Sequence, residues 1–171
     1  LAMLATEPLT QPPRDGADDH RIRELALLAL DRMTADPSVD LCVDALTPWA
    51  AQRVSNAAVV TVQDPTFRPE ELPVLERAYD ALSGCCVACA RSFAQEATLV
   101  AWSIDDARAF RVWLERLDAI YARECALSTG RGRSCDLFDD GVVYLHDHGV
   151  ARGWIPASSA IRTAASSTRS R

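Results

Sequence analysis

The chain has 171 residues, of which 49% are hydrophobic and 25% are charged, and its net charge is −6 at pH 7. These values are typical of a globular protein with a sizeable core. The acidic balance argues against a nucleic-acid-binding surface, and the apolar runs are too short for a transmembrane helix.

Both ends of the chain are polar and rich in Pro, Gly or Ser, so they cannot bury enough surface to fold alone. Tails of this kind are ordered when another molecule holds them. Together with the first helix they are predicted to contact other protein subunits. The expected regions are an extended tail over 1–18, an additional helix over 19–40, a helical bundle over 41–155 and a second tail over 156–171.

Apolar residues at helical spacing predict a helix over 19–35, with Asp18 or Asp19 as its N-cap and Asp36-Pro37 as its end. A second apolar segment runs from about 39 to 60, with Pro48 near a helix start or a kink. A third helical segment begins near Pro69 and breaks at Gly84. Its apolar stripe consists of Leu75, Tyr79, Leu82, Cys86, Cys89 and Phe93.

The next helix is preceded by a capping signal at Ser103 and Asp106. Its apolar face is formed by Phe110, Leu114, Leu117 and Tyr121, and it extends to about Leu127. Only VVTVQ at 59–63 and GVVYL at 141–145 indicate strands. The sequence therefore predicts an all-α fold.

Three of the six cysteines, Cys85, Cys86 and Cys89, lie within five residues. Cysteine is a small hydrophobe, so the cluster would suit a buried helix face. A zinc site would need four ligands, and His146-x-His148 would supply the second pair if 141–150 were a strand. No second CxxC follows, so no metal is predicted.

A redox-active pair needs its first cysteine near a helix N-terminus, where free N–H groups stabilise a thiolate. Gly84 supplies the helix break, so Cys86 is predicted to open a new helix and to form a disulfide with Cys89. A bond between Cys85 and Cys86 would be strained. Cys42, Cys125 and Cys135 are unassigned, and Cys125–Cys135 is the favoured additional bridge.

Further residues share a pattern with this pair. Cys89 lies four residues before Phe93 and 24 before Trp113, and Trp49 lies 37 residues before Cys86. With Cys135 and Gly153-Trp154, this pattern resembles the Erv/ALR family of FAD-linked sulfhydryl oxidases. The resemblance implies a four-helix bundle of Erv/ALR type over about 41–155, with an extra N-terminal helix and extended tails. Its core is expected to include Trp49, Leu82, Phe93, Phe110, Trp113 and Leu117.

The resemblance assigns the FAD site of the family to Trp49, Arg53, Trp113, Asp118 and Arg123. Arg53 and Asp118 stand where the family has histidines, and Ala119 stands where it has an asparagine. The carboxylate of Asp118 would repel an anionic dinucleotide, and Ala119 loses hydrogen bonds worth about 1 kcal/mol each. Arg53 would have to compensate by reaching the pyrophosphate. No cofactor is therefore favoured.

The favoured function is that of a non-catalytic accessory subunit in a larger assembly, which the resemblance places in the mitochondrion, in the intermembrane space. The alternative is an active FAD-linked sulfhydryl oxidase, in which Cys86 accepts electrons by disulfide exchange and Cys89 passes them to the flavin. A second alternative is a small helical zinc-binding or interaction module. Neither nucleic acid nor a membrane span is expected.

Overall fold

A computed structural model describes residues 16–58, 67–129 and 140–157, and every regular element in these ranges is a helix. The all-α prediction is thus confirmed for the described part of the chain. None of its helices is both long enough and apolar enough to cross a membrane. The elements are α1 (Gly16–Ala35), α2 (Leu46–Ala58), α3 (Glu71–Leu82), α4 (Val87–Ser103), α5 (Ala107–Thr129) and α6 (Asp140–Ala151).

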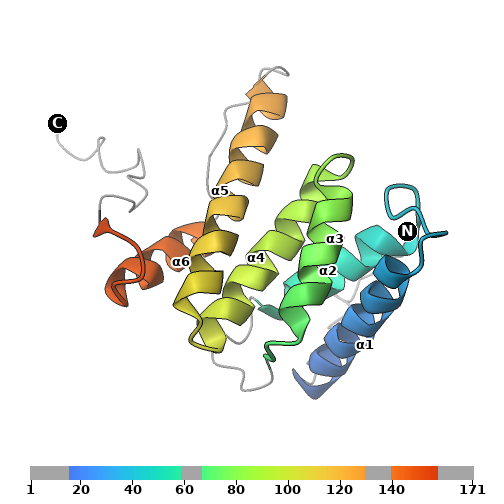
Figure 1. Cartoon of the computed structure of the whole chain (residues 1–171), viewed down its shortest axis with the longest axis horizontal. Coiled ribbons are helices and arrows are strands. Elements are labelled where there is room, and N and C mark those ends of the chain that lie inside the picture. Colours follow the sequence, from blue (N-terminus) through green and yellow to red (C-terminus); the bar gives the residue numbers. More distant parts are fainter. Residues whose placement is uncertain (1–15, 59–66, 130–139, 158–171) are drawn as a thin grey trace, which may run out of the picture.

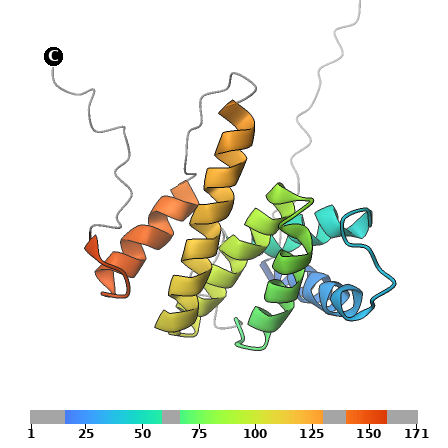
Figure 2. The same ribbon diagram turned by 45° about the horizontal axis from the view of Figure 1, so that its top comes forward.

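Helix α4 is the centre of the arrangement, since it packs against α2, α3 and α5 and also touches α6. Figure 1 shows it between α3 and α5, with α1 and α6 at opposite ends, and Figure 2 shows the same order. Its buried face is rich in alanine, and small side chains allow neighbouring helices to approach closely. These alanines are Ala90, Ala94, Ala97 and Ala101.

The expected core is confirmed except at one position. Leu82, Phe93, Phe110, Trp113 and Leu117 all belong to one buried cluster. Trp49 does not, and the prediction that it is buried was wrong, because its side chain is 40% exposed. Helix α2 instead turns small and branched side chains inward, namely Ala50, Ala51 and Val54.

Aspartates organise the connection between α1 and α2 by accepting backbone N–H groups two residues ahead, in turns that mimic a helical cap. Asp36 Oδ1 accepts from Ser38 N at 2.9 Å, and Asp40 Oδ1 accepts from Cys42 N at 2.9 Å. Asp44 Oδ1 accepts from Leu46 N at 2.7 Å, at the start of α2. The loop therefore has a defined path, which places Cys42 beside the end of α3.

Three local predictions need correction. Helix α1 begins at Gly16, so Asp18 and Asp19 lie inside it and do not form its N-cap. Helix α4 continues through Ser103, so the N-cap of α5 is Asp106, whose Oδ1 accepts from Arg108 N and Ala109 N. The turn between them is completed by Asp105 at φ 62°. The segment GVVYL is helical and lies in α6, because Val142 and Leu145 face the core at a spacing of three residues. VVTVQ lies outside the described residues.

Charged side chains also lie inside the helical packing. Arg23 of α1 is buried and donates from Nε to Glu96 Oε1 of α4 at 2.7 Å. Its Nη1 and Nη2 donate to Glu71 Oε1 and Oε2 of α3 at 3.2 Å and 2.6 Å. One guanidinium thus joins three helices.

The backbone of α6 at Gly149 lies directly against the side chains of Phe110 and Ile155. A Cβ atom at this position would lie 2.8 Å from Phe110 Cε1 and 3.1 Å from Ile155 side-chain atoms. We expect Gly149→Ala to lower the free energy of unfolding by about 1–3 kcal/mol, because the packed aromatic ring must shift. Urea unfolding measures this loss.

Gly84→Ala is the matched control, since a Cβ atom at Gly84 would meet nothing within 4 Å. Its free energy of unfolding should change by no more than about 0.5 kcal/mol. Equal losses for the two variants would contradict the predicted packing of α6 on α5.

Candidate functional site

The turn between α3 and α4 carries the cysteine cluster. Leu82 O accepts from the backbone N–H groups of Cys85 and Cys86, at 3.0 Å and 2.8 Å. Cys86 then leaves the helical conformation, with φ −127° and ψ 83°, and forms the N-cap of α4. The predicted break at Gly84 and new helix at Cys86 are confirmed.

Cys86 and Cys89 form a disulfide, with their Cα atoms 5.3 Å apart, as predicted. The backbone N–H of Cys89 points at Cys86 Sγ at 3.3 Å. Cys86 is half-buried, whereas Cys89 is 6% exposed and belongs to the core. An incoming thiolate would therefore reach Cys86 Sγ more easily, and the helix N-terminus would stabilise a thiolate formed on Cys86.

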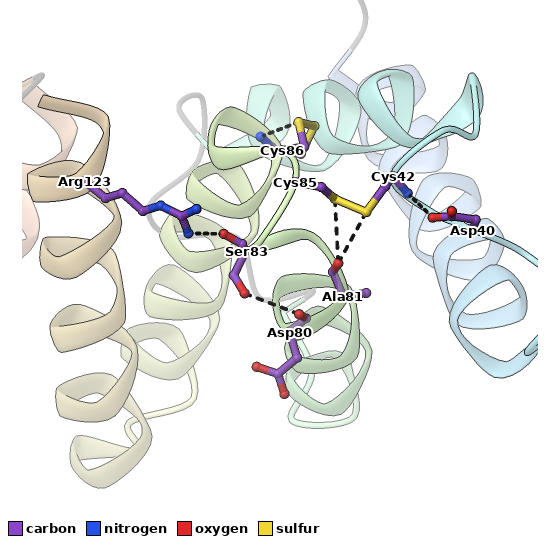
Figure 3. The surroundings of a disulfide bond; sticks show 9 residues. Asp40, Cys42, Asp80, Ala81, Ser83, Cys85, Cys86 and Arg123 are labelled. Carbon is purple, nitrogen blue, oxygen red and sulfur yellow. Dashed lines mark hydrogen bonds between the residues drawn. A yellow bond between two sulfur atoms is a disulfide. The ribbon is translucent and has the colours of Figure 1, made fainter. Parts of the chain in front are cut away.

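A second disulfide joins Cys42 to Cys85 across a sequence separation of 43 residues, with a Cα–Cα distance of 5.8 Å. Both cysteines are exposed. The sulfurs of Cys42 and Cys85 lie 3.7 Å and 3.8 Å from the carbonyl oxygen of Ala81. Figure 3 shows this arrangement. Since disulfide sulfurs carry no proton, we interpret these distances as close contacts and not as donated hydrogen bonds. The bond fastens the α1–α2 loop to the end of α3.

The sequence analysis left Cys42 unassigned and did not find this bridge. The sequence held only an indirect indication of this bond. A Cys85–Cys86 bond would be strained, so a disulfide at Cys85 would favour a partner further away in the sequence. Cys125 is also disulfide-bonded. Cys135, its predicted partner, lies outside the described residues. No cysteine in the described part of the chain is free.

The zinc interpretation required His146 and His148 to share one face of a strand. Both lie on α6, where residues two apart point about 200° apart around the helix. His146 Nε2 lies 2.9 Å from Asp118 Oδ1, and the ring of His148 packs against Tyr144 and Trp102. Over the described ranges, no group of three or more His, Cys, Asp or Glu side chains could hold a metal ion.

The five positions assigned to the FAD site come from two helices. Trp49 and Arg53 belong to α2, and Arg53 is half-buried, with an Nε atom that lacks a hydrogen-bond partner. Trp113, Asp118 and Arg123 belong to α5. Helices α2 and α5 each pack against α4 and form no extensive interface with each other.

The α5 positions are already engaged by protein groups. Tyr79 contacts the Trp113 ring edge-on, with centroids 5.7 Å apart, and the Arg116 guanidinium lies 4.5 Å from the Trp113 centroid. Asp118 pairs with His146, and Arg123 donates to the carbonyl of Ser83 in the cysteine turn, as Figure 3 shows. Asp118, Arg123 and the Trp113 ring are thus in contact with other protein groups.

No protein-family model matches the chain, and neither the curated proteins nor the solved structures include a match to it.

The two disulfides should differ in their effect on stability. Replacing Cys42 and Cys85 by serine should lower the free energy of unfolding by about 4 kcal/mol, from the closure entropy of a 43-residue loop. The matched control replaces Cys86 and Cys89 by serine. These residues are only 3 positions apart, so the loss in the free energy of unfolding should be less than about 2 kcal/mol.

Denaturant unfolding without reductant measures both losses. A larger loss for the Cys86/Cys89 variant would show that this bond, and not the Cys42–Cys85 bond, contributes more to the stability of the fold.

Proposed function

We propose that this chain is a non-catalytic helical subunit of a larger protein assembly. The observation that carries the proposal is the engagement of Trp113, Asp118 and Arg123 by neighbouring protein groups. In an Erv/ALR-like bundle these positions would bind the flavin. Here they stabilise the packing of α5 against α3, α6 and the cysteine turn, so the architecture would be retained without the cofactor.

Exposed apolar side chains at the start of α2 support a role in binding other proteins. Val43 is 80% exposed and Leu46 is 57% exposed, and Trp49 lies three residues further along. A spacing of three residues places Leu46 and Trp49 on one side of the helix. Adjacent exposed apolar residues, and tryptophan above all, are typical of protein interfaces.

The disulfides bear on the compartment. Bonds such as Cys42–Cys85 persist in oxidising environments and are rare where thiols are kept reduced. We therefore propose the mitochondrial intermembrane space as the compartment of this protein, because the family resemblance favours it.

Two measurements test the proposal. Denatured protein should release no flavin, and the native protein should oxidise no dithiol even after incubation with FAD, because the α5 side chains are engaged. Near-stoichiometric flavin in the supernatant would overturn the proposal and restore the oxidase.

The second measurement is site-specific photo-crosslinking in the native cell extract. A photoreactive residue at Leu46 should give one discrete protein adduct, identified by mass spectrometry. The same residue at Val112, which is 44% exposed on α5, is the control and should give none. Identical adducts at both positions, or a monomer without adducts at either, would contradict a role for the α2 surface.

A second candidate function is thiol–disulfide exchange, which the N-cap position of Cys86 favours. A substrate thiolate would attack Cys86 Sγ, the Cys86–Cys89 bond would break, and Cys89 would leave as a thiolate. A second substrate thiol would then displace Cys86, so that the substrate becomes a disulfide and the protein pair becomes a dithiol.

This exchange is tested with Cys89→Ser, which leaves Cys86 as a free thiol. If the exchange reaction operates, the variant should form a mixed disulfide with an oxidised cysteine-containing peptide, detected as a mass increase. The control, Cys86→Ser, leaves only the buried Cys89 and should react at least tenfold more slowly, a rough figure based on access. Equal rates would remove the basis for this candidate.

A further inference from the structure

The buried cluster of Arg23, Glu71 and Glu96 has one cation for two carboxyl groups. Glu71 receives two of the guanidinium's N–H groups, and Glu96 receives Nε–H through its Oε1. Glu96 is 0% exposed, and its Oε2 is buried without a hydrogen-bond partner. A buried carboxylate oxygen without a partner is costly, and protonation of the carboxyl group removes the charge.

Charged groups on the surrounding helices do not supply the missing partner. Arg68, just before α3, lies 3.8 Å from Glu71 Oε1. The one charged residue of α2, Arg53, makes no hydrogen bond or ion pair with Glu96 in the described structure. The described ion pairs of α5 and α6 with known partners lead elsewhere, for example from Arg116 to Glu76 and from Asp118 to His146.

Burial therefore raises the pKa of Glu96 to about 7, although Arg23 lowers it in part. The pKa of Arg23 is raised, because the attraction of Glu96 and Glu71 outweighs the effect of burial. Arg23 thus keeps its charge, and Glu96 is the group that titrates.

Helix α1 is the part of the described structure whose removal would return Glu96 to water. It packs against α2 and α3, and Arg23 extends from it to Glu96. Among the described residues its chain connection to the rest is the loop 36–45, whose far end the Cys42–Cys85 bond fixes. We propose that α1 docks on the bundle with uptake of a proton by Glu96, so that α1 opens more readily as the solution becomes more alkaline.

The direction follows from linkage. Glu96 has a pKa of about 7 when α1 is docked, against 4.5 for a solvated glutamate. The proton-linked stabilisation of docking is complete below pH 4.5 and is lost as the pH rises to about 7 and beyond. Between pH 6 and pH 8 the docking equilibrium constant should fall about tenfold.

Opening would expose the apolar face of α1, formed by Ala26, Leu27 and Leu30, together with the surfaces of α2 and α3 beneath it. The inference does not depend on the proposed function. It assigns to α1 a pH-controlled exposure of apolar surface.

Amide hydrogen exchange tests the inference on the full chain. After correction for intrinsic exchange rates, the opening constant of amides 26–30 in α1 should rise about tenfold from pH 6 to pH 8. Core amides of α4, around Val100, exchange through global unfolding, which also exposes Glu96, so their opening constant should rise by a similar factor but from a much lower value. In Glu96→Gln the rise should disappear, since the amide does not titrate, while the surface control Glu76→Gln should retain it.

Three results would overturn the inference. These are a wild-type α1 whose opening is independent of pH, a Glu96→Gln variant that retains the dependence, and opening constants in α1 that equal those in α4, because α1 would then open only by global unfolding. If Glu96→Gln does not fold, the carboxyl carbon of Glu96 in the wild-type protein provides the second measurement by NMR titration. A midpoint near pH 7 supports the inference, and a midpoint near 4.5 overturns it.

Discussion

The guanidinium of Arg23 joins three helices that are far apart in the sequence, and the position of α1 on the bundle depends on this interaction. It binds the first residue of α3, Glu71, and a residue in the middle of α4, Glu96. Breaking a buried pair by removing one partner is strongly destabilising, because a charge is left without compensation. Helix α1 therefore has one favourable position on α2 and α3, with Arg23 reaching α4, and Phe67 closes the cluster with its ring 4.6 Å from the guanidinium.

At its other end α3 is held covalently. The Cys42–Cys85 bond lies at the C-terminal end of α3, whereas Glu71 lies at its N-terminal end. The α1–α2 segment is thus attached to both ends of α3, by an ionic contact at its N-terminal end and by a disulfide at its C-terminal end. The Arg123 contact with Ser83 adds α5 to the same turn. These contacts favour a structural role for the turn. Within the Cys86–Cys89 pair, Cys86 is the half-buried residue and Cys89 is the buried one.

The sequence predicted elements whose signals are local. The helical segments and the Cys86–Cys89 pair follow from residue spacing, Gly84 and Asp36-Pro37, which act within a few residues. The Arg23 cluster and the Cys42–Cys85 bond join residues that are 48, 73 and 43 positions apart, so no local pattern reports them. One signal was available, since Glu96 comes directly before the apolar and small residues 97–102, where a charge needs a buried partner.

Trp49 shows a different limit of predicting burial from the spacing of residues in the sequence. The family resemblance, which rests in part on the spacing of Trp49 from Cys86, assigned Trp49 to the core, yet the neighbouring Ala50 and Ala51 occupy the inward face of α2. On a helix, a shift of one position rotates a side chain by about 100°, so a spacing argument with an error of one residue assigns the wrong face. The candidate flavin positions were predicted from spacing of this kind, and their contacts inside the protein depend on tertiary packing.

The adjacent positions of Cys85 and Cys86 have a consequence for how the protein is made. Cys86 and Cys89 are close along the chain, so their bond can form early, whereas Cys42 meets Cys85 only after a loop of 43 residues has closed. A nascent chain that paired Cys85 with Cys89 would leave Cys86 for Cys42, with the same number of bonds and the turn displaced by one residue. The start of α4 at Val87, with Cys86 as its N-cap, selects between these isomers. If this helix end forms before oxidation, the native pairing is favoured directly, and disulfide reshuffling is needed only for chains that were oxidised earlier.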